Sequence, residues 1–174
     1  TPAVAQQRVF LAGDSTVAEY GPDRDPQAGW GQALQAYLKD GWEVRNHAIG
    51  GRSSRSFIEQ GRLDGIAAEL AAGDVLLIQF GHNDAKVEDP SRYSDPEAAY
   101  PQWLSRYLAL ARERGATPVL VTPVARRSFE DGRLLDTHGP YPQAVRALAR
   151  REGVALVDLN ALSMDWLRQA GDAA

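Results

Sequence analysis

The sequence contains no cysteine and only three histidines among its 174 residues. The absence of cysteine excludes disulfide bonds, thiolate metal sites and a cysteine nucleophile from this sequence. A mechanism that needs an imidazole base has only His47, His82 and His138 available within it.

Long apolar runs and an excess of positive charge are also missing. No apolar stretch approaches the ~20 residues that cross a bilayer. The formal net charge of −4 disfavours binding to nucleic acid or to an anionic membrane. Hydrophobic residues make up 44% and charged residues 24%, as in an ordinary globular protein. We therefore expect no nucleic-acid partner and no membrane partner.

The first seven residues, Thr1–Gln7, are small or polar. We expect residues 1–7 to be a flexible leader, such as the remnant of a cleaved export signal, and the protein to be secreted or periplasmic. Residues 8–174 have the length of one domain with a substantial core.

Short apolar runs alternate with helical patterns, which favours an α/β fold with a mostly parallel sheet. A long polar stretch over residues 82–99 is typical of a functional loop. Residues 126–135 form an excursion that turns at Asp131-Gly132. The expected strands are residues 8–12, 43–49, 75–80, 118–122 and 155–158. The expected helices are residues 30–38, 63–71, a segment beginning near Pro101, 141–152 and 161–169.

Three short loops follow the first three expected strands. Ser15 lies after the first strand, Gly51 after the second and Asn83 after the third. Because ligands of open parallel sheets bind at the carboxyl ends of the strands, where the strand order reverses, we expect these loops to meet at one edge. A serine exposed there can act as a nucleophile if hydrogen-bond donors and a base converge on it.

Each of these residues also has a plainer interpretation. Asp-Ser-Thr suits a helix N-cap, paired glycines suit a turn, and an asparagine after a strand suits an Asx-turn. In the functional interpretation, the backbone N–H groups of Ser15 and Gly51 and the side-chain amide of Asn83 form an oxyanion hole.

At these residues the chain resembles a known family, the SGNH (GDSL-type) hydrolases. Gly13-Asp14-Ser15, Gly51 and Gly81-His82-Asn83-Asp84 are similar to its first three sequence blocks. The resemblance extends from Arg8 to Leu162. Four longer strings resemble the rhamnogalacturonan acetylesterase branch of that family, namely Leu11–Thr16, Gly50–Phe57, Phe80–Asp84 and Leu135–Gly139.

The resemblance implies a three-layer α/β/α, flavodoxin-like fold with a five-stranded parallel sheet in the order 2-1-3-4-5. It also implies that Ser15 is the nucleophile and that Gly51 and Asn83 are oxyanion donors. The implied reaction is the removal of acetyl groups from a plant cell-wall carbohydrate, rhamnogalacturonan or a similar pectin, through an acetyl-enzyme. This chemistry needs no cofactor and no metal.

One element of the family pattern is absent. SGNH hydrolases end in an Asp-x-x-His block that supplies the general base and the carboxylate that orients it, and no such spacing occurs in this sequence. His138, two residues after Asp136, is the best substitute base within it. We prefer the interpretation that the domain is truncated at its C-terminus, which would expose apolar sheet surface and favour self-association. The alternative is an incomplete, poorly active variant.

Candidate substrate-binding residues surround these blocks. The planar guanidinium of Arg52 suits the carboxylate of a galacturonate unit, although a structural salt bridge is an equal alternative. Trp30 is a candidate for stacking on a sugar ring, and Asp14, His82 and Asp84 complete the set. Two rival functions stay open: a catalytically silent carbohydrate-binding domain, and a lipase or thioesterase of the same superfamily.

Overall fold

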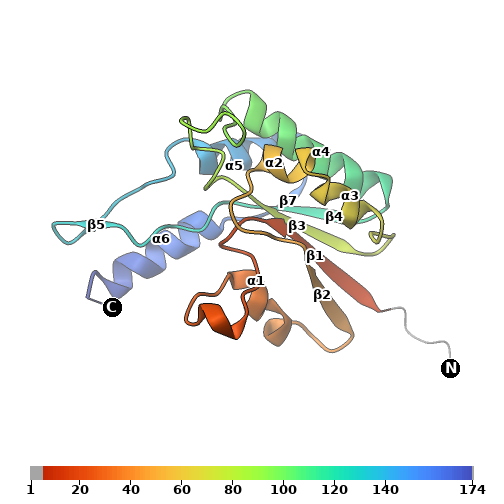
Figure 1. The fold of residues 1–174 in the computed structure, drawn as a ribbon, viewed down its shortest axis with the longest axis horizontal. Coiled ribbons are helices and arrows are strands. Elements are labelled where there is room, and N and C mark those ends of the chain that lie inside the picture. The colour runs from red at the N-terminus through yellow and green to blue at the C-terminus, as the bar shows by residue number, and fades with distance from the viewer. Residues whose placement is uncertain (1–5, 174) are drawn as a thin grey trace.

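The structure, a computed structural model, describes residues 6–173. Its centre is a parallel sheet in the order β2-β1-β3-β4-β7, with helices on both faces (Figure 1). This confirms the predicted three-layer α/β/α fold and its strand order. The five strands are β1 (Gln7–Gly13), β2 (Trp42–Asn46), β3 (Val75–Gln79), β4 (Thr117–Val121) and β7 (Ala155–Val157).

Of the predicted flexible leader, residues 1–7, the structure describes only residues 6 and 7. Residues 1–5 lie outside the described residues. Gln7 contradicts the prediction, because it is the first residue of β1 and pairs with Trp42 of β2.

Two helical layers enclose the sheet. On one face lie α2 (Ser54–Glu59), α3 (Arg62–Ala67), α4 (Ala99–Glu113) and α5 (Tyr141–Glu152). On the other lie α1 (Trp30–Ala33), the 3-10 helix η2 (Leu34–Tyr37) and α6 (Leu159–Ala170). A short 3-10 helix, η1 (Pro22–Arg24), precedes α1.

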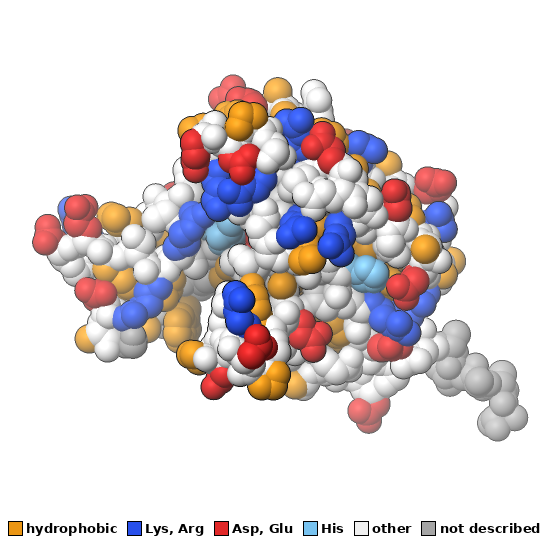
Figure 2. All heavy atoms as spheres, viewed as in Figure 1, with side chains coloured by type: hydrophobic (Ala, Val, Ile, Leu, Met, Phe, Trp, Pro, Cys, Tyr) orange, Lys and Arg blue, Asp and Glu red, His pale blue; other side chains and the backbone are white. Residues whose placement is uncertain are grey.

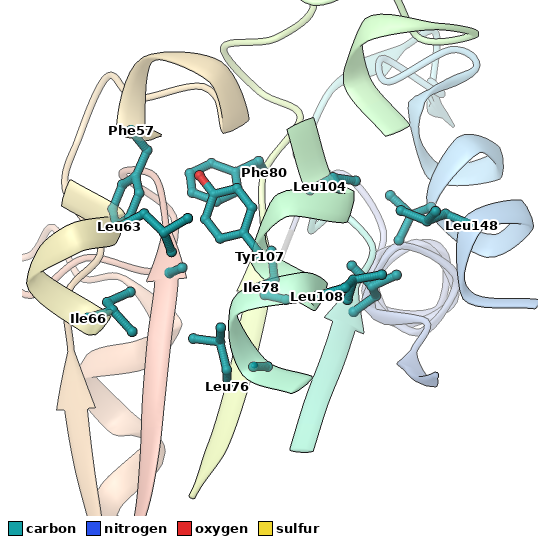
Figure 3. Packing of buried hydrophobic residues seen from close by; sticks show 14 of the residues in the cluster. Phe57, Leu63, Ile66, Leu76, Ile78, Phe80, Leu104, Tyr107, Leu108 and Leu148 are labelled. Atoms are coloured by element: carbon teal, nitrogen blue, oxygen red, sulfur yellow. The ribbon is translucent and has the colours of Figure 1, made fainter. Parts of the chain in front are cut away.

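The alternation of side chains along β1 divides the core between the two faces of the sheet. Phe10 packs with the large cluster under α2 to α5, whereas Val9 and Leu11 pack against the α1 side. In the large cluster the rings of Phe57, Phe80 and Tyr107 meet with centroids 5.2–6.0 Å apart (Figure 3). This packing fixes α2 and α4 over the carboxyl half of β3.

Several helices differ from the predictions; α3, for example, ends at Ala67 and not at residue 71. The expected helix over residues 30–38 changes into a 3-10 helix at Leu34, and α2 was not predicted. Its start does carry a local signal: the Ser53 hydroxyl accepts from the backbone N–H of Ser56, and the Ser56 hydroxyl accepts from the N–H of Ser53. Gly61, with φ of +74°, separates α2 from α3 and makes both helices short.

The second strand also ends earlier than predicted. Asn46 closes β2 because its Oδ1 accepts from the N–H of Ala48 at 3.0 Å and its Nδ2 donates to the carbonyl of Val17 at 2.9 Å. The side chain thus forms an Asx-turn directly after the strand, while the N–H groups of His47 and Ile49 still donate to the carbonyls of Leu11 and Gly13 in β1.

The predicted excursion is confirmed as a hairpin. Strands β5 (Phe129–Glu130) and β6 (Arg133–Leu134) pair antiparallel around Asp131 and Gly132, whose φ angles are +49° and +74°. Positive φ at both central positions is what a tight hairpin turn requires. The hairpin projects beyond the sheet near the C-terminal part of α6 (Figure 1).

Apolar side chains are exposed along β7 and α6. Leu156 and Val157 are 37% and 41% exposed, and Leu162 and Trp166 are 63% and 66% exposed. Apolar side chains of β7 and α6 are thus exposed to solvent at this edge of the sheet. Self-association through this surface stays a prediction. Among residues 6–173, no helix has both the length and the apolar character to span a bilayer.

We expect Leu108→Ala to destabilise the protein by about 2–5 kcal/mol, because Leu108 is 1% exposed inside the large cluster and its truncation leaves a cavity. Leu162→Ala is the matched control, since the same truncation at an exposed site removes little packing. Urea unfolding monitored by circular dichroism gives both values. Equal losses in the two variants would contradict this account of the core.

Candidate active site

The loop after β1 is built on the carboxylate of Asp14. Asp14 is fully buried, and its Oδ1 accepts from the N–H of Thr16 at 2.9 Å and from the Thr16 hydroxyl at 2.7 Å. The Asp14 carbonyl accepts from the N–H groups of Val17 and Ala18. These bonds form a tight turn that leaves Ser15 partly exposed at its tip. The carboxylate of Asp14 thus faces the interior and shapes the serine loop, while its predicted contact with substrate stays a prediction.

A chain of hydrogen bonds supports this turn from below. The Thr16 hydroxyl accepts from Gln79 Nε2 at 2.7 Å, and Gln79 Oε1 accepts from Trp30 Nε1 at 2.9 Å. Trp30, predicted to stack on a sugar, packs instead against the cluster of Val9, Leu11 and Val17. Sequence reasoning missed Gln79, although a glutamine within an otherwise apolar strand was an available signal.

The second loop passes directly beside Ser15. A Cβ added to Gly50 would lie 3.6 Å from Ser15 Cβ, and Gly51 has a left-handed φ of +78° that suits glycine. Arg52, predicted to bind substrate, donates from Nη1 to the Gly50 carbonyl at 2.8 Å and from Nε to Gln60 at 2.9 Å. Its guanidinium thus holds the loop that carries Gly51.

The third loop is joined to the second by Asn83. This side chain is 4% exposed, and its Nδ2 donates to the carbonyl of Arg52 at 3.0 Å. The close approach of Gly50 to Ser15 and the bond of Asn83 to Arg52 place the three loops together at the carboxyl edge of β2, β1 and β3. The predicted convergence of the loops is thereby observed.

Asp84, also predicted to contact substrate, lies in the interior behind the third loop. It is fully buried and accepts from the backbone N–H of Ser54, at 3.1 and 3.0 Å to its two oxygens, and from the Ser54 hydroxyl. Tyr107 donates to the Ser54 carbonyl, and Tyr141 donates to the Asp84 carbonyl. Asp84 therefore fastens the third loop to the start of α2. Burial raises its pKa from 3.8 to about 7, against the opposing effect of the Ser54 hydrogen bonds.

Two histidines lie together behind the serine loop. His82 is 9% exposed, with Nδ1 3.4 Å from Asp14 Oδ2, and its ring meets that of His138 edge-on at 4.5 Å. His138 is 3% exposed, and its Nε2 lies 2.8 Å from the Val124 carbonyl, which defines Nε2 as the protonated nitrogen. Its Nδ1 has no hydrogen-bond partner among residues 6–173. Burial, followed by the charge of His82, lowers the pKa of His138 from 6.5 to about 4.

The third histidine is remote from this cluster. His47 stacks on Phe10, with centroids 5.8 Å apart, and lies 3.6 Å from Glu69. Within the described part of the chain, no three or more His, Asp or Glu side chains form a group that could hold a metal ion.

The chain is similar to known proteins over most of its length. Residues 11–174 match the model of the GDSL-like Lipase/Acylhydrolase family. The chain belongs to this family. It is 45% identical over 164 residues to the probable rhamnogalacturonan acetylesterase YesY of Bacillus subtilis, and 50% identical over 153 residues to the rhamnogalacturonan acetylesterase RhgT of the same organism. These alignments cover 94% and 87% of the chain.

A solved structure supports the assignment of the chain to the GDSL-like family. The crystal structure of the Bacillus subtilis protein YxiM superposes with a TM-score of 0.86 and 31% sequence identity over 98% of the chain. The chain spans 75% of the length of YesY, 64% of RhgT and 48% of the YxiM chain.

We expect Asp84→Asn to change how stability depends on pH. The pKa of Asp84 is higher in the folded protein than in the unfolded chain, so the unfolded chain loses the Asp84 proton first. Asp84 therefore disfavours folding increasingly as the pH rises from about 4 to about 7. The unfolding free energy of the wild type relative to Asp84→Asn should therefore fall across this interval and become constant above it. Urea titrations at several pH values measure the difference, and a difference that rises with pH would refute the assignment.

For His138 we expect the opposite dependence. Its pKa is lowered on folding, so the unfolded chain binds the additional proton, and stability is lost as the pH falls from about 6.5 to about 4. His138→Gln, which keeps a donor for the Val124 carbonyl, should lack this loss. The same titrations measure it, and parallel curves for wild type and variant would show that His138 is not buried in its neutral form.

Proposed function

We propose that this protein is a carboxylic ester hydrolase that removes acetyl groups from rhamnogalacturonan or a similar pectic carbohydrate. The observation that carries the proposal is the position of Ser15 beside the Gly50-Gly51 loop, which Asn83 joins through its bond to Arg52. The names of YesY and RhgT support the acetylated pectic substrate. Export is part of the proposal, because a polymeric substrate is met outside the cell.

In the proposed reaction, Ser15 Oγ attacks the acetyl carbonyl carbon and passes its proton to a base. The negative oxygen of the tetrahedral intermediate accepts from the N–H groups of Ser15 and Gly51 and from Asn83 Nδ2. The C–O bond to the sugar then breaks, the sugar oxygen takes the proton, and an acetyl-enzyme is left. Water attacks this ester and releases acetate and free Ser15.

The base within the described chain is proposed to be His138, acting through Nδ1. Its environment limits this role, because a base with a pKa of about 4 removes a hydroxyl proton poorly at neutral pH. The ring of His82 meets that of His138 edge-on, and its Nδ1 lies beside Asp14. The charge of His82 contributes to the lowered pKa of His138.

The rim of the site carries arginines that suit an anionic sugar. Arg126 is partly exposed and donates from Nη1 to the Thr137 hydroxyl at 3.2 Å and from Nη2 to the His82 carbonyl at 3.5 Å. Figure 2 shows basic side chains interspersed with acidic ones on this view of the molecule. Attraction of a pectic carboxylate is therefore local, since the net charge of −4 supplies none at long range.

We expect the chain to release acetate from acetylated rhamnogalacturonan and from an aryl acetate, and Ser15→Ala to reduce both rates to background. Chromatographic measurement of acetate tests the polymer, and absorbance tests the aryl ester. His138→Ala is assayed beside it: loss of hydrolysis identifies His138 as the base, whereas retained hydrolysis excludes it.

Two outcomes would contradict the proposal. Binding of the carbohydrate with no acetate release would favour a silent binding domain. Preference for long-chain acyl esters over the acetylated polymer would favour a lipase or thioesterase.

A further inference from the structure

Arg92 reaches a residue of the oxyanion hole from the long loop that precedes α4. Its Nη1 donates to Asn83 Oδ1 at 3.2 Å, and its Nε donates to Asp89 Oδ2 at 2.6 Å. The Asn83 amide is buried, whereas the Arg92 side chain is 28% exposed. The reaction described above gives Arg92 no role.

The contacts of Asn83 fix the orientation of its amide. The oxygen of an asparagine side chain only accepts hydrogen bonds, and its nitrogen only donates two. Here the oxygen accepts from Arg92, and the nitrogen donates to the Arg52 carbonyl. If the amide turned by 180°, its oxygen would face the carbonyl oxygen of Arg52 and its NH2 group would face a cation. Both contacts would be repulsive, so one orientation is strongly favoured.

This orientation is the one that an oxyanion hole needs. One Nδ2–H is used by the Arg52 carbonyl, and the other remains for a negatively charged oxygen. A cation bound to Oδ1 withdraws electron density from the amide nitrogen, which makes its N–H a stronger donor. Arg92 therefore strengthens the hydrogen bond from Asn83 Nδ2 to the oxyanion in two ways, by orienting the amide and by polarising it.

The loop that carries Arg92 is itself held in place. The backbone N–H groups of Arg92 and Tyr93 donate to the Asp89 carbonyl at 3.0 and 2.9 Å, and the N–H of Ser94 donates to the Asp84 carbonyl at 3.0 Å. From α2, Arg55 Nη1 donates to the Pro90 carbonyl at 3.0 Å. The guanidinium of Arg92 is thus presented to Asn83 by a fixed backbone.

We propose that Arg92 is a positioning residue of the oxyanion hole, which orients and polarises the Asn83 amide without contacting the substrate. This inference rests on the proposed function for its effect on rate. Its geometric part, the contact between Arg92 and Asn83, is tested independently of activity below.

With a neutral aryl acetate, we expect Arg92→Gln to lower kcat by about tenfold, a fraction of the ~100- to 1000-fold loss that removal of an oxyanion donor causes. KM should change little, because the ester carries no charge for Arg92 to bind. In an Asn83→Ala background the same substitution should have almost no effect, since the group on which Arg92 acts is gone. Arg92→Lys keeps the charge and should restore part of the rate.

Arg55→Gln is the matched control for the loop. It removes another arginine that holds the same segment, through Pro90, but has no bond to Asn83. An equal kcat loss in Arg55→Gln and Arg92→Gln would overturn the proposal in favour of general loop anchoring. A loss that persists undiminished in the Asn83→Ala background would overturn it in favour of a direct role of Arg92.

Nuclear magnetic resonance of the side-chain amide tests the contact itself. The Asn83 Nδ2 signals, assigned by their absence in Asn83→Ala, should shift and exchange faster with solvent in Arg92→Gln, and should stay unchanged in Arg55→Gln. Unchanged signals in Arg92→Gln would refute the inference even in an active enzyme. If the wild type released no acetate, the proposed function would fail, while this measurement would still decide whether Arg92 orients Asn83.

Discussion

The buried carboxylate of Asp84 is the interaction on which the geometry of the site depends. It binds the backbone N–H and hydroxyl of Ser54 and so fastens the third loop to the first turn of α2. Because Gly51 lies three residues before Ser54 and Asn83 directly precedes Asp84, one buried contact sets the spacing between the two. Burying a carboxylate is costly unless its oxygens are hydrogen-bonded, and here the bonding partners are the loops of the site themselves.

A second buried carboxylate, that of Asp14, holds the loop of Ser15 in the same way. Asp14 closes the turn that exposes Ser15, and the chain from Thr16 through Gln79 to Trp30 connects that turn to β3 and to α1. Polar groups placed inside an apolar core have few alternative arrangements with all bonds made, so they favour one loop conformation. Ser15 is therefore held in place by its neighbours Asp14 and Thr16 and, through Thr16, by Gln79 and Trp30.

The arginines around the site follow a common pattern. Arg52, Arg92 and Arg126 each donate to an oxygen of a site loop, respectively the Gly50 carbonyl, the Asn83 side chain and the His82 carbonyl. From the sequence alone, Arg52 was interpreted as a ligand for a substrate carboxylate or as a member of a structural salt bridge. In the structure each of these three guanidinium groups is bonded to the protein's own loops.

The sequence by itself determined the parallel α/β fold, the positions of most strands, and the loops that carry Ser15, Gly51 and Asn83, because periodicity and short glycine-rich motifs are local properties of the chain. Only the tertiary structure decided that Asp14, Asp84 and Trp30 support the site from within, and that His138 is paired with His82. Hydrogen bonds of this kind join residue 54 with 84 and residue 30 with 79, and a buried close approach joins residue 14 with 82. Contacts between such distant positions depend on how strands and helices pack. The local sequence around each residue therefore does not predict which residue it will contact.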